Sequence, residues 1–175
     1  MVVTLQEALK SESLEDVEDA ISRFKCLDKD VETFLKTKAI DFERRDKSRT
    51  YLVFDDDALL GYFTLSLNAL PFRQEVSNNM IKRIDGFSKD VKAVGIILIG
   101  QFGKDSERAG TFKGSELLNL CMQKIRIAKG ILGGRFVMLE CLEIPQVVSF
   151  YEKNGFAVLQ KDEKDKYLQM IRRLQ

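Results

Sequence analysis

The spacing of apolar residues in the first third of the chain changes from a helical period to a strand period. After Ser13, a typical helix N-cap, apolar positions recur every three or four residues up to Phe24, and the same spacing predicts a second helix over Asp30 to Arg45. From Thr50 to Phe54 and from Leu59 to Leu67 the period is two, which predicts a hairpin. The three aspartates between these strands predict its turn rather than a calcium site, because no further oxygen ligand follows at the required spacing.

The remainder of the chain predicts alternating strands and helices. The expected elements are a short helix near Ser77 to Ile84, a buried strand over Ala93 to Ile99, a loop to Gly114, a helix from Ser115 to Ala128 closed by Gly130, Gly133 and Gly134, a strand over Arg135 to Cys141, a helix from Pro145 to Asn154-Gly155, and strands over Phe156 to Leu159 and Tyr167 to Ile171.

These elements predict a mixed α/β fold in one domain covering residues 1–175. The strand, loop, helix and strand between residues 93 and 141 suit a right-handed parallel crossover, whereas the hairpin and the last two strands should pair antiparallel. The expected architecture is a mixed, mostly antiparallel sheet with helices on both faces.

Composition excludes several classes of chemistry. The chain has no histidine, so it holds neither a Ser-His-Asp nor a Cys-His nucleophile system and no histidine-ligated metal. Its three cysteines are far apart, which predicts reduced, mostly buried thiols in a cytoplasmic protein and no zinc site. We see no basic, apolar leader at the N-terminus and no apolar run of membrane-spanning length. The net charge of +1 argues against binding nucleic acid through bulk charge.

Charge is nevertheless distributed unevenly. Residues 1–60 hold fifteen acids and ten bases, whereas residues 104–135 hold seven bases and three acids. The basic half contains the predicted loop from Gly103 to Gly114, which leads into a helix N-terminus, and such helix ends bind anions. A second basic cluster ends the helix predicted up to Arg45, and it forms either a solvated helix terminus or an anionic-substrate site: Arg44, Arg45, Lys47 and Arg49.

A second candidate element is the sequence Phe150-Tyr151-Glu152-Lys153-Asn154-Gly155-Phe156, in which a helix ends at a glycine and a strand follows. Tyr151 lies one turn before the helix end. Two interpretations of this tyrosine stay open, a core residue and a proton donor.

Together the loop and this element resemble the GNAT superfamily of acetyl-CoA-dependent N-acetyltransferases, over roughly Thr50 to Ile171. The resemblance implies a parallel strand pair that splays to admit acetyl-CoA, and a loop Q/R-x-x-G-x-G/A whose N–H groups hold the pyrophosphate. Gly114 matches the last position of that loop, but Ala109 stands at the Gln/Arg position and Phe112 at the middle glycine. The residues that the resemblance places at the cofactor are Phe102, Gly103, Lys104, Ala109, Gly110, Phe112, Lys113, Gly114 and Ser115, with Arg108 as a further source of charge.

The resemblance implies direct attack of an amine on the thioester, with Tyr151 protonating the leaving thiolate. Because histidine is absent, the base is a carboxylate or solvent, and Glu140 is the best-placed carboxylate, on the strand beside the splay. Its alternative role is a solvent-facing or lysine-paired strand residue. The expected partners are acetyl-CoA and an unidentified primary amine, with no metal and no membrane.

The sequence leaves three further possibilities open. Ile99 to Asp105 and Gly134 to Phe136 are similar to GNAT-type toxins that acetylate aminoacyl-tRNA, which is the one nucleic-acid substrate that we retain. A GNAT-like module that binds a ligand or partner without turnover is the non-enzyme alternative, motivated by the altered loop. The sequence is also compatible with a homodimer.

Overall fold

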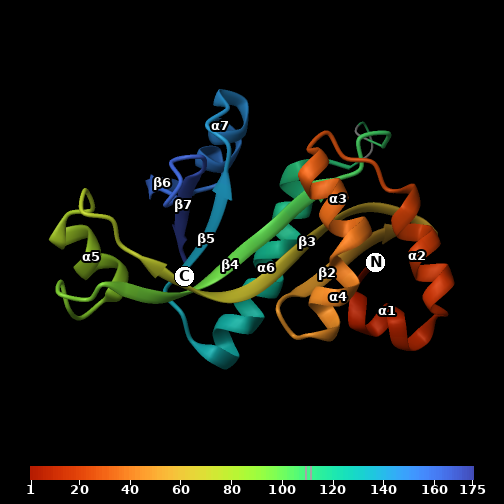
Figure 1. The fold of residues 1–175 in the computed structure, drawn as a ribbon, viewed down its shortest axis with the longest axis horizontal. Helices are drawn as coiled ribbons and strands as arrows, with labels where there is room; N and C mark the ends of the chain where they lie inside the picture. The colour runs from red at the N-terminus through yellow and green to blue at the C-terminus, as the bar shows by residue number, and fades with distance from the viewer. Residues whose placement is uncertain (109, 111) are drawn as a thin grey trace. The chain divides into compact units, whose positions relative to one another are not determined.

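The computed structural model describes residues 1–175 except Ala109 and Thr111. Its described elements are, in chain order, β1 (Val2–Thr4), α1 (Leu5–Ser11), α2 (Leu14–Arg23), α3 (Lys29–Thr37), α4 (Ala39–Arg44), β2 (Arg49–Asp55), β3 (Ala58–Pro71), α5 (Asn78–Asp85), β4 (Ala93–Lys104), α6 (Gly114–Leu132), β5 (Phe136–Cys141), α7 (Pro145–Lys153), β6 (Ala157–Lys161) and β7 (Leu168–Arg173) (Figure 1).

The strands form a mixed sheet in the order β1-β2-β3-β4-β5-β7-β6. β4 and β5 pair in parallel through the crossover helix α6, from Ile97 opposite Val137 to Ile99 opposite Leu139. The β2–β3 hairpin and the β6–β7 pair are antiparallel. The predicted mixed sheet, its parallel crossover and its antiparallel ends are therefore confirmed.

Residues 1–66 and 100–124 form one compact unit. Helices α1 to α4 bury one face of the hairpin, where Leu52 and Tyr62 lie opposite each other and are 1 % and 0 % exposed. On the other face Tyr51 stacks on Phe63 with ring centroids 4.9 Å apart, and Lys124 of α6 lies 5.6 Å from the Tyr51 ring. The strand period of two thus divides the hairpin between two helical layers.

Residues 67–99 and 125–175 form the second compact unit. Its core gathers apolar side chains from β3, α5, β4, β5 and β7, among them Leu70, Ile84, Ile96 and Met138. Arg135 donates from Nε to the carbonyl oxygen of Ile84 at 3.2 Å, which ties the end of α5 to the start of β5. The expectation of a single domain stays a prediction.

The structure contains a strand and a helix before Ser13 that the sequence pattern did not predict. Val2 pairs with Val53 to begin β1, and α1 begins directly after it. Thr4 caps α1 by accepting from the Glu7 N–H, while Glu7 accepts from the Thr4 N–H at 2.8 Å. This capping box is a sequence signature (Thr-x-x-Glu) that could have located the helix.

The helix predicted over Asp30 to Arg45 is wrong as one element. It divides at Lys38, whose φ of −128° and ψ of −26° leave the helical region, into α3 and α4. The kink allows Leu35 of α3 and Ala39 of α4, which are 1 % and 0 % exposed, to be buried in the same cluster. Burial of both residues therefore overrides the local helical pattern.

β4 and α6 extend beyond their predicted ends. β4 continues to Lys104, so Gly103 and Lys104 lie on the strand and not in the loop. α6 continues to Leu132 and includes Gly130, and the chain turns at Gly133 and Gly134, whose φ values are +77° and +114°. The loop that joins β4 to α6 therefore begins at Asp105.

Candidate active site

The β4–α6 loop is anchored by a buried carboxylate that the sequence did not single out. Asp105, 5 % exposed, accepts hydrogen bonds from three backbone N–H groups, those of Lys25 (3.0 Å), Glu107 (2.9 Å) and Arg108 (3.1 Å). Its own N–H donates to the carbonyl oxygen of Leu60 at 2.7 Å. Burying a polar group costs free energy unless the group is hydrogen-bonded. The Asp105 side chain meets this requirement by accepting from backbone N–H groups, and these bonds hold the loop in shape. Asp105 therefore sets the loop's starting conformation.

The other end of the loop is the N-terminus of α6. Glu116 accepts the Lys113 N–H at 2.6 Å, and the Lys113 carbonyl oxygen accepts from Glu116 and Leu117 at 3.0 and 3.2 Å. The N–H groups of Gly114 and Ser115 belong to the first turn, where α-helical geometry provides no intrahelical acceptor. Both residues are half-buried, and Lys113 is exposed. The helix end thus presents two N–H groups and one cation.

Gly103 is a glycine for reasons of packing. A Cβ atom at Gly103 would lie 2.6 Å from Cγ1 of Val31 and 3.2 Å from Sγ of Cys26. Burial raises the pKa of the Cys26 thiol and of the Tyr62 hydroxyl, which donates to the Val31 carbonyl oxygen at 2.5 Å. These groups stay protonated at neutral pH, so they support the loop structurally.

The other residues predicted to contact the cofactor differ in how far they are exposed to solvent. Gly110 is exposed, and a Cβ atom there would meet nothing within 4 Å. Phe112 is half-buried and, through its carbonyl oxygen, accepts a bond from Lys104 Nζ. Phe102 lies on β4 and is half-buried. Ala109, predicted at the Gln/Arg position, lies outside the described residues.

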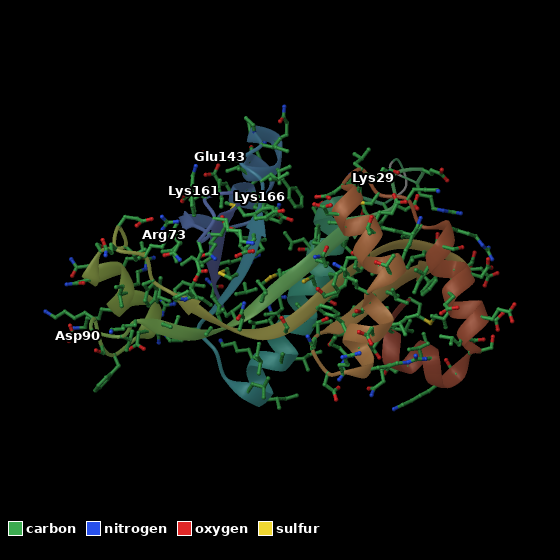
Figure 2. The ribbon with its side chains drawn as sticks, viewed as in Figure 1. Lys29, Arg73, Asp90, Glu143, Lys161 and Lys166 are labelled. Atoms are coloured by element: carbon green, nitrogen blue, oxygen red, sulfur yellow. The ribbon has the colours of Figure 1, made fainter. Side chains whose placement is uncertain are left out.

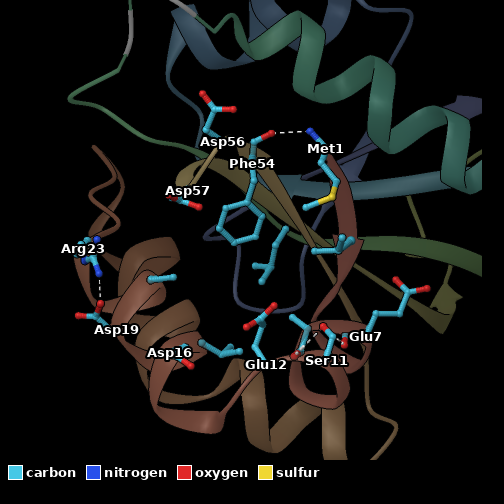
Figure 3. Close-up of a pocket in the computed structure, with 15 residues that line it drawn as sticks. Met1, Glu7, Ser11, Glu12, Asp16, Asp19, Arg23, Phe54, Asp56 and Asp57 are labelled. Carbon is cyan, nitrogen blue, oxygen red and sulfur yellow. Dashed lines mark hydrogen bonds and ion pairs between the residues drawn. The ribbon is translucent and has the colours of Figure 1, made fainter.

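Two cavities are lined by described residues of the compact unit that contains this loop. One, of about 400 Å³, borders the start of the loop and is lined by Arg23, Lys25 and Arg108 together with Asp57, Asp105 and Glu107. The other, of about 340 Å³, is lined by apolar residues that include Leu52 and Phe54 and by the carboxylates of Glu7, Glu12, Asp16, Asp19, Asp56 and Asp57, with one side-chain cation, Arg23 (Figure 3). Because carboxylates outnumber cations in its lining, this second cavity repels phosphate groups and does not suit the diphosphate of acetyl-CoA.

The predicted catalytic residues both belong to the second unit. Glu140 lies on β5, is exposed, and accepts a hydrogen bond of 2.8 Å from Nε2 of Gln169. Tyr151 on α7 is 8 % exposed, and its ring makes edge-to-face contacts with Phe150 and Phe156 at centroid distances of 5.1 and 5.8 Å. The Tyr151 ring is thus packed against two aromatic neighbours, and its assignment as proton donor stays a prediction.

In the basic cluster at the end of α4, three of the four residues have structural partners. Arg49 binds the buried Glu43 and also Asp46, and Arg45 binds Asp41 at 2.9 Å. Lys47 lies 5.4 Å from the centre of the Phe42 ring. These contacts favour the interpretation as a helix terminus over an anionic-substrate site.

Comparisons with known proteins identify the fold. No protein-family model matches the sequence, and no curated protein matches it significantly. Among solved structures, AtaT complexed with acetyl-methionyl-tRNAfMet aligns with a TM-score of 0.71 at 19 % identity, over 96 % of this chain and 92 % of that chain. A tyrosine-to-phenylalanine mutant of KacT aligns with a TM-score of 0.70 at 21 % identity, over 97 % and 92 %. A protein described as a bacterial toxin gives 0.74 at 15 % identity, over 99 % and 90 %.

The chain therefore has the fold of GNAT-type toxins, which confirms the predicted fold. Within the described part of the chain, no group of three His, Cys, Asp or Glu side chains is arranged to hold a metal ion. No helix among those residues combines the length and apolar character that crossing a membrane requires.

Proposed function

We propose that the chain is an acetyl-CoA-dependent N-acetyltransferase that acetylates a primary amine. The observation that carries the proposal is the N-terminus of α6, where the N–H groups of Gly114 and Ser115 and the side chain of Lys113 follow the loop anchored by Asp105. A helix N-terminus with a neighbouring cation binds phosphate oxygens, and acetyl-CoA carries a diphosphate. The same fold occurs in an AtaT toxin mutant that was solved with the C-terminus of the antitoxin AtaR and acetyl-CoA.

The residues fit such a ligand, although Ala109 and Phe112 depart from the family loop and one N–H group at the helix end already has an acceptor. The Lys113 N–H already donates a hydrogen bond to the Glu116 carboxylate. The N–H groups of Gly114 and Ser115 are therefore the ones that remain to bind the diphosphate. Phe112, which is half-buried, replaces a glycine, so its side chain either turns outward or narrows the space for the phosphates. Lys113 and Arg108 supply positive charge. These differences predict weaker binding than a fully matching loop would give.

Bound acetyl-CoA supplies the acetyl group as an activated thioester. In the proposed reaction Glu140 takes a proton from the acceptor's ammonium group, and the resulting amine forms the new C–N bond with the carbonyl carbon as the C–S bond breaks. The nitrogen then releases its surplus proton to solvent, which leaves a neutral amide. Tyr151 gives its hydroxyl proton to the departing thiolate. Backbone N–H groups at Phe102 and Lys104 are the proposed donors to the carbonyl oxygen and the pantetheine arm.

Within this proposal, the α-amino group of an aminoacyl-tRNA is the alternative acceptor to an unidentified primary amine. The similarity to AtaT complexed with acetyl-methionyl-tRNAfMet supports this acceptor, and AtaT structures with the antitoxin AtaR suggest a protein partner of that kind. The alternative without turnover, a ligand-binding module, is favoured by the Glu116 carboxylate at the helix end, because it occupies part of the anion site.

Calorimetry with acetyl-CoA, followed by assay of CoA release, tests the proposal. The acceptor panel contains small primary amines, peptides with free N-termini, and aminoacyl-tRNA beside the same tRNA uncharged. The proposal predicts binding heat and acceptor-dependent release, and release with charged tRNA alone would select the tRNA acceptor. Heat without release from any acceptor would support the binding module, and the absence of heat would contradict the proposal.

A further inference from the structure

Three polar side chains form a row across strands β6, β7 and β5. Gln160 lies opposite Gln169, and Gln169 lies opposite Glu140. Directly paired residues of antiparallel strands project from the same face of a sheet, so all three side chains share one face. A register shift between Val158 and Gln160 brings Gln160 into this row. Irregularities of this kind re-aim side chains and are common beside active sites.

The row is joined by hydrogen bonds between side chains. Nε2 of Gln160 donates to Oε1 of Gln169 at 2.7 Å, and Nε2 of Gln169 donates to Oε1 of Glu140 at 2.8 Å. Gln160 and Gln169 are only 6 % and 8 % exposed, whereas Glu140 faces solvent. The exposed end of the row is therefore the carboxylate.

Backbone groups at the buried end determine the direction of every bond. The Arg73 N–H donates to Oε1 of Gln160 at 3.0 Å, and Nε2 of Gln160 donates to the Pro71 carbonyl oxygen at 2.8 Å. A backbone N–H can only donate and a carbonyl can only accept, so the Gln160 amide has one orientation. That orientation presents an N–H to Oε1 of Gln169. Gln169 must then turn its own NH₂ group toward Glu140.

The buried end is itself held in place. The Arg73 side chain donates to the Asp162 carbonyl oxygen and to Oδ1 of Asp165, both at 2.7 Å, which attaches the segment after β3 to the β6–β7 turn. Figure 2 labels Arg73, and also Glu143 and Lys161, which form an ion pair of 2.9 Å in the same unit. A chain of bonds thus runs from a fixed backbone to one exposed carboxylate.

Two buried amides are an unusual choice inside a sheet, because burying a polar group costs free energy that apolar side chains would not require. We infer that Gln169 is a positioning residue that holds the Glu140 carboxylate in the orientation needed to accept the proton of the acceptor amine, and that Gln160 fixes the orientation of Gln169. This inference rests on the proposed acetyl transfer.

The test is a double-mutant cycle of Gln169→Met and Glu140→Gln, with the member of the acceptor panel that the wild type acetylates fastest as the amine. For each variant kcat, KM for that amine and the melting temperature are measured. Methionine keeps the length of the side chain and removes the donor. We expect Gln169→Met to lower kcat about tenfold or more while KM changes little, as loss of a bond to a charged group predicts. In the Glu140→Gln background, Gln169→Met should lower kcat no further. Glu143→Gln, which removes another exposed carboxylate of the same unit, should leave kcat unchanged.

Each outcome decides between the structural and the positioning role. An unchanged kcat in Gln169→Met, or an equal fold loss in both backgrounds, would overturn the inference while the active wild type upholds the proposed function. A wild type without acetyl transfer would overturn both. Should Gln169→Met fail to fold, Gln160→Met replaces it, since it removes the N–H that fixes the orientation of the Gln169 amide, and the same cycle applies.

Discussion

Lys104 Nζ donates a hydrogen bond of 3.2 Å to the carbonyl oxygen of Phe112, across the loop that joins β4 to α6. Asp105 holds the first residues of the loop through their N–H groups. The bond from Lys104, a residue of β4, holds the last residues of the loop. The Lys104 side chain contacts the backbone carbonyl of Phe112, and Glu116 contacts the backbone N–H of Lys113. A substitution of the Phe112 side chain therefore leaves both contacts in place. The loop can therefore be tested one side chain at a time.

Phe112→Gly should tighten CoA binding, because it removes a bulky side chain two residues before the start of α6 and restores the family residue. The cost is a free energy of unfolding lower by about 0.5–1 kcal/mol, since glycine adds conformational freedom to the unfolded chain. Calorimetry and denaturant unfolding measure the two effects. Phe112→Ala is the matched control, which removes the ring with less added freedom. A less stable variant without tighter binding would show that Phe112 is a packing residue and that the loop has been misaligned.

Lys113→Glu should weaken CoA binding by about 1–3 kcal/mol, because it places a negative charge beside the phosphates in place of a positive one. Calorimetric titration of CoA measures the change. Arg44→Glu makes the same reversal on an exposed residue of α4 and should leave the affinity unchanged. Equal weakening in both variants would attribute the effect to net charge, and unchanged affinity in Lys113→Glu would place the phosphates elsewhere.

Gly103→Ala should destabilise the protein by about 1–3 kcal/mol, the typical cost of overpacking. The added methyl would lie 2.6 Å from Cγ1 of Val31, so the Val31 side chain, β4 or α3 must shift. Gly95→Ala is the control on the same strand, where the added Cβ would have no atom within 4 Å, and it should change stability by less than about 0.5 kcal/mol. Denaturant unfolding compares the two variants, and similar stabilities would contradict the close approach.

Glu32 should make stability depend on acid pH. Hydrogen bonds from the Cys26 N–H, Lys36 and Lys29 lower the pKa of Glu32 to about 2. Because the folded pKa lies below the unfolded one, the stabilisation is present at neutral pH and is lost as the pH falls from about 4.5 toward 2. The stability difference between wild type and Glu32→Gln should therefore be largest at neutral pH and shrink over that interval.

Unfolding measured as a function of pH checks this difference, with Glu18→Gln on the exposed face of α2 as the control. A constant difference between wild type and Glu32→Gln down to about pH 2 would contradict the lowered pKa.

The sequence predicts those parts of the fold that depend on local pattern. The apolar run of β4, the periodic helix α6 and the Ser77 cap of α5 each have a signal within a few residues. The missed features depend on contacts between distant segments. Asp105 accepts from the N–H of Lys25, 80 residues earlier, and Gly103 is required by Val31 on α3. The row ending at Glu140 depends on a register shift that no sequence pattern marks.

Tyr151→Phe should lower kcat by about 10²–10⁴-fold while CoA affinity changes little, because the substitution removes a proposed general acid and keeps the ring. The ring contacts with Phe150 and Phe156 remain, so the melting temperature should be close to that of the wild type. Steady-state kinetics and thermal unfolding of this variant separate the two roles. Turnover within about threefold of wild type would remove Tyr151 from the mechanism, and a lower melting temperature with normal turnover would identify a structural tyrosine.

The central claim, acetyl transfer to an amine, is tested most directly with acetyl-CoA that carries an isotopic label in its acetyl group. Purified wild-type protein is incubated with the labelled thioester and the acceptor panel, and the acceptors are analysed by mass spectrometry. The account predicts the label in an amide of one acceptor class, with one CoA released for each acetyl group transferred. Labelled acetyl-CoA recovered intact from every incubation, or released only as free acetate, would contradict it.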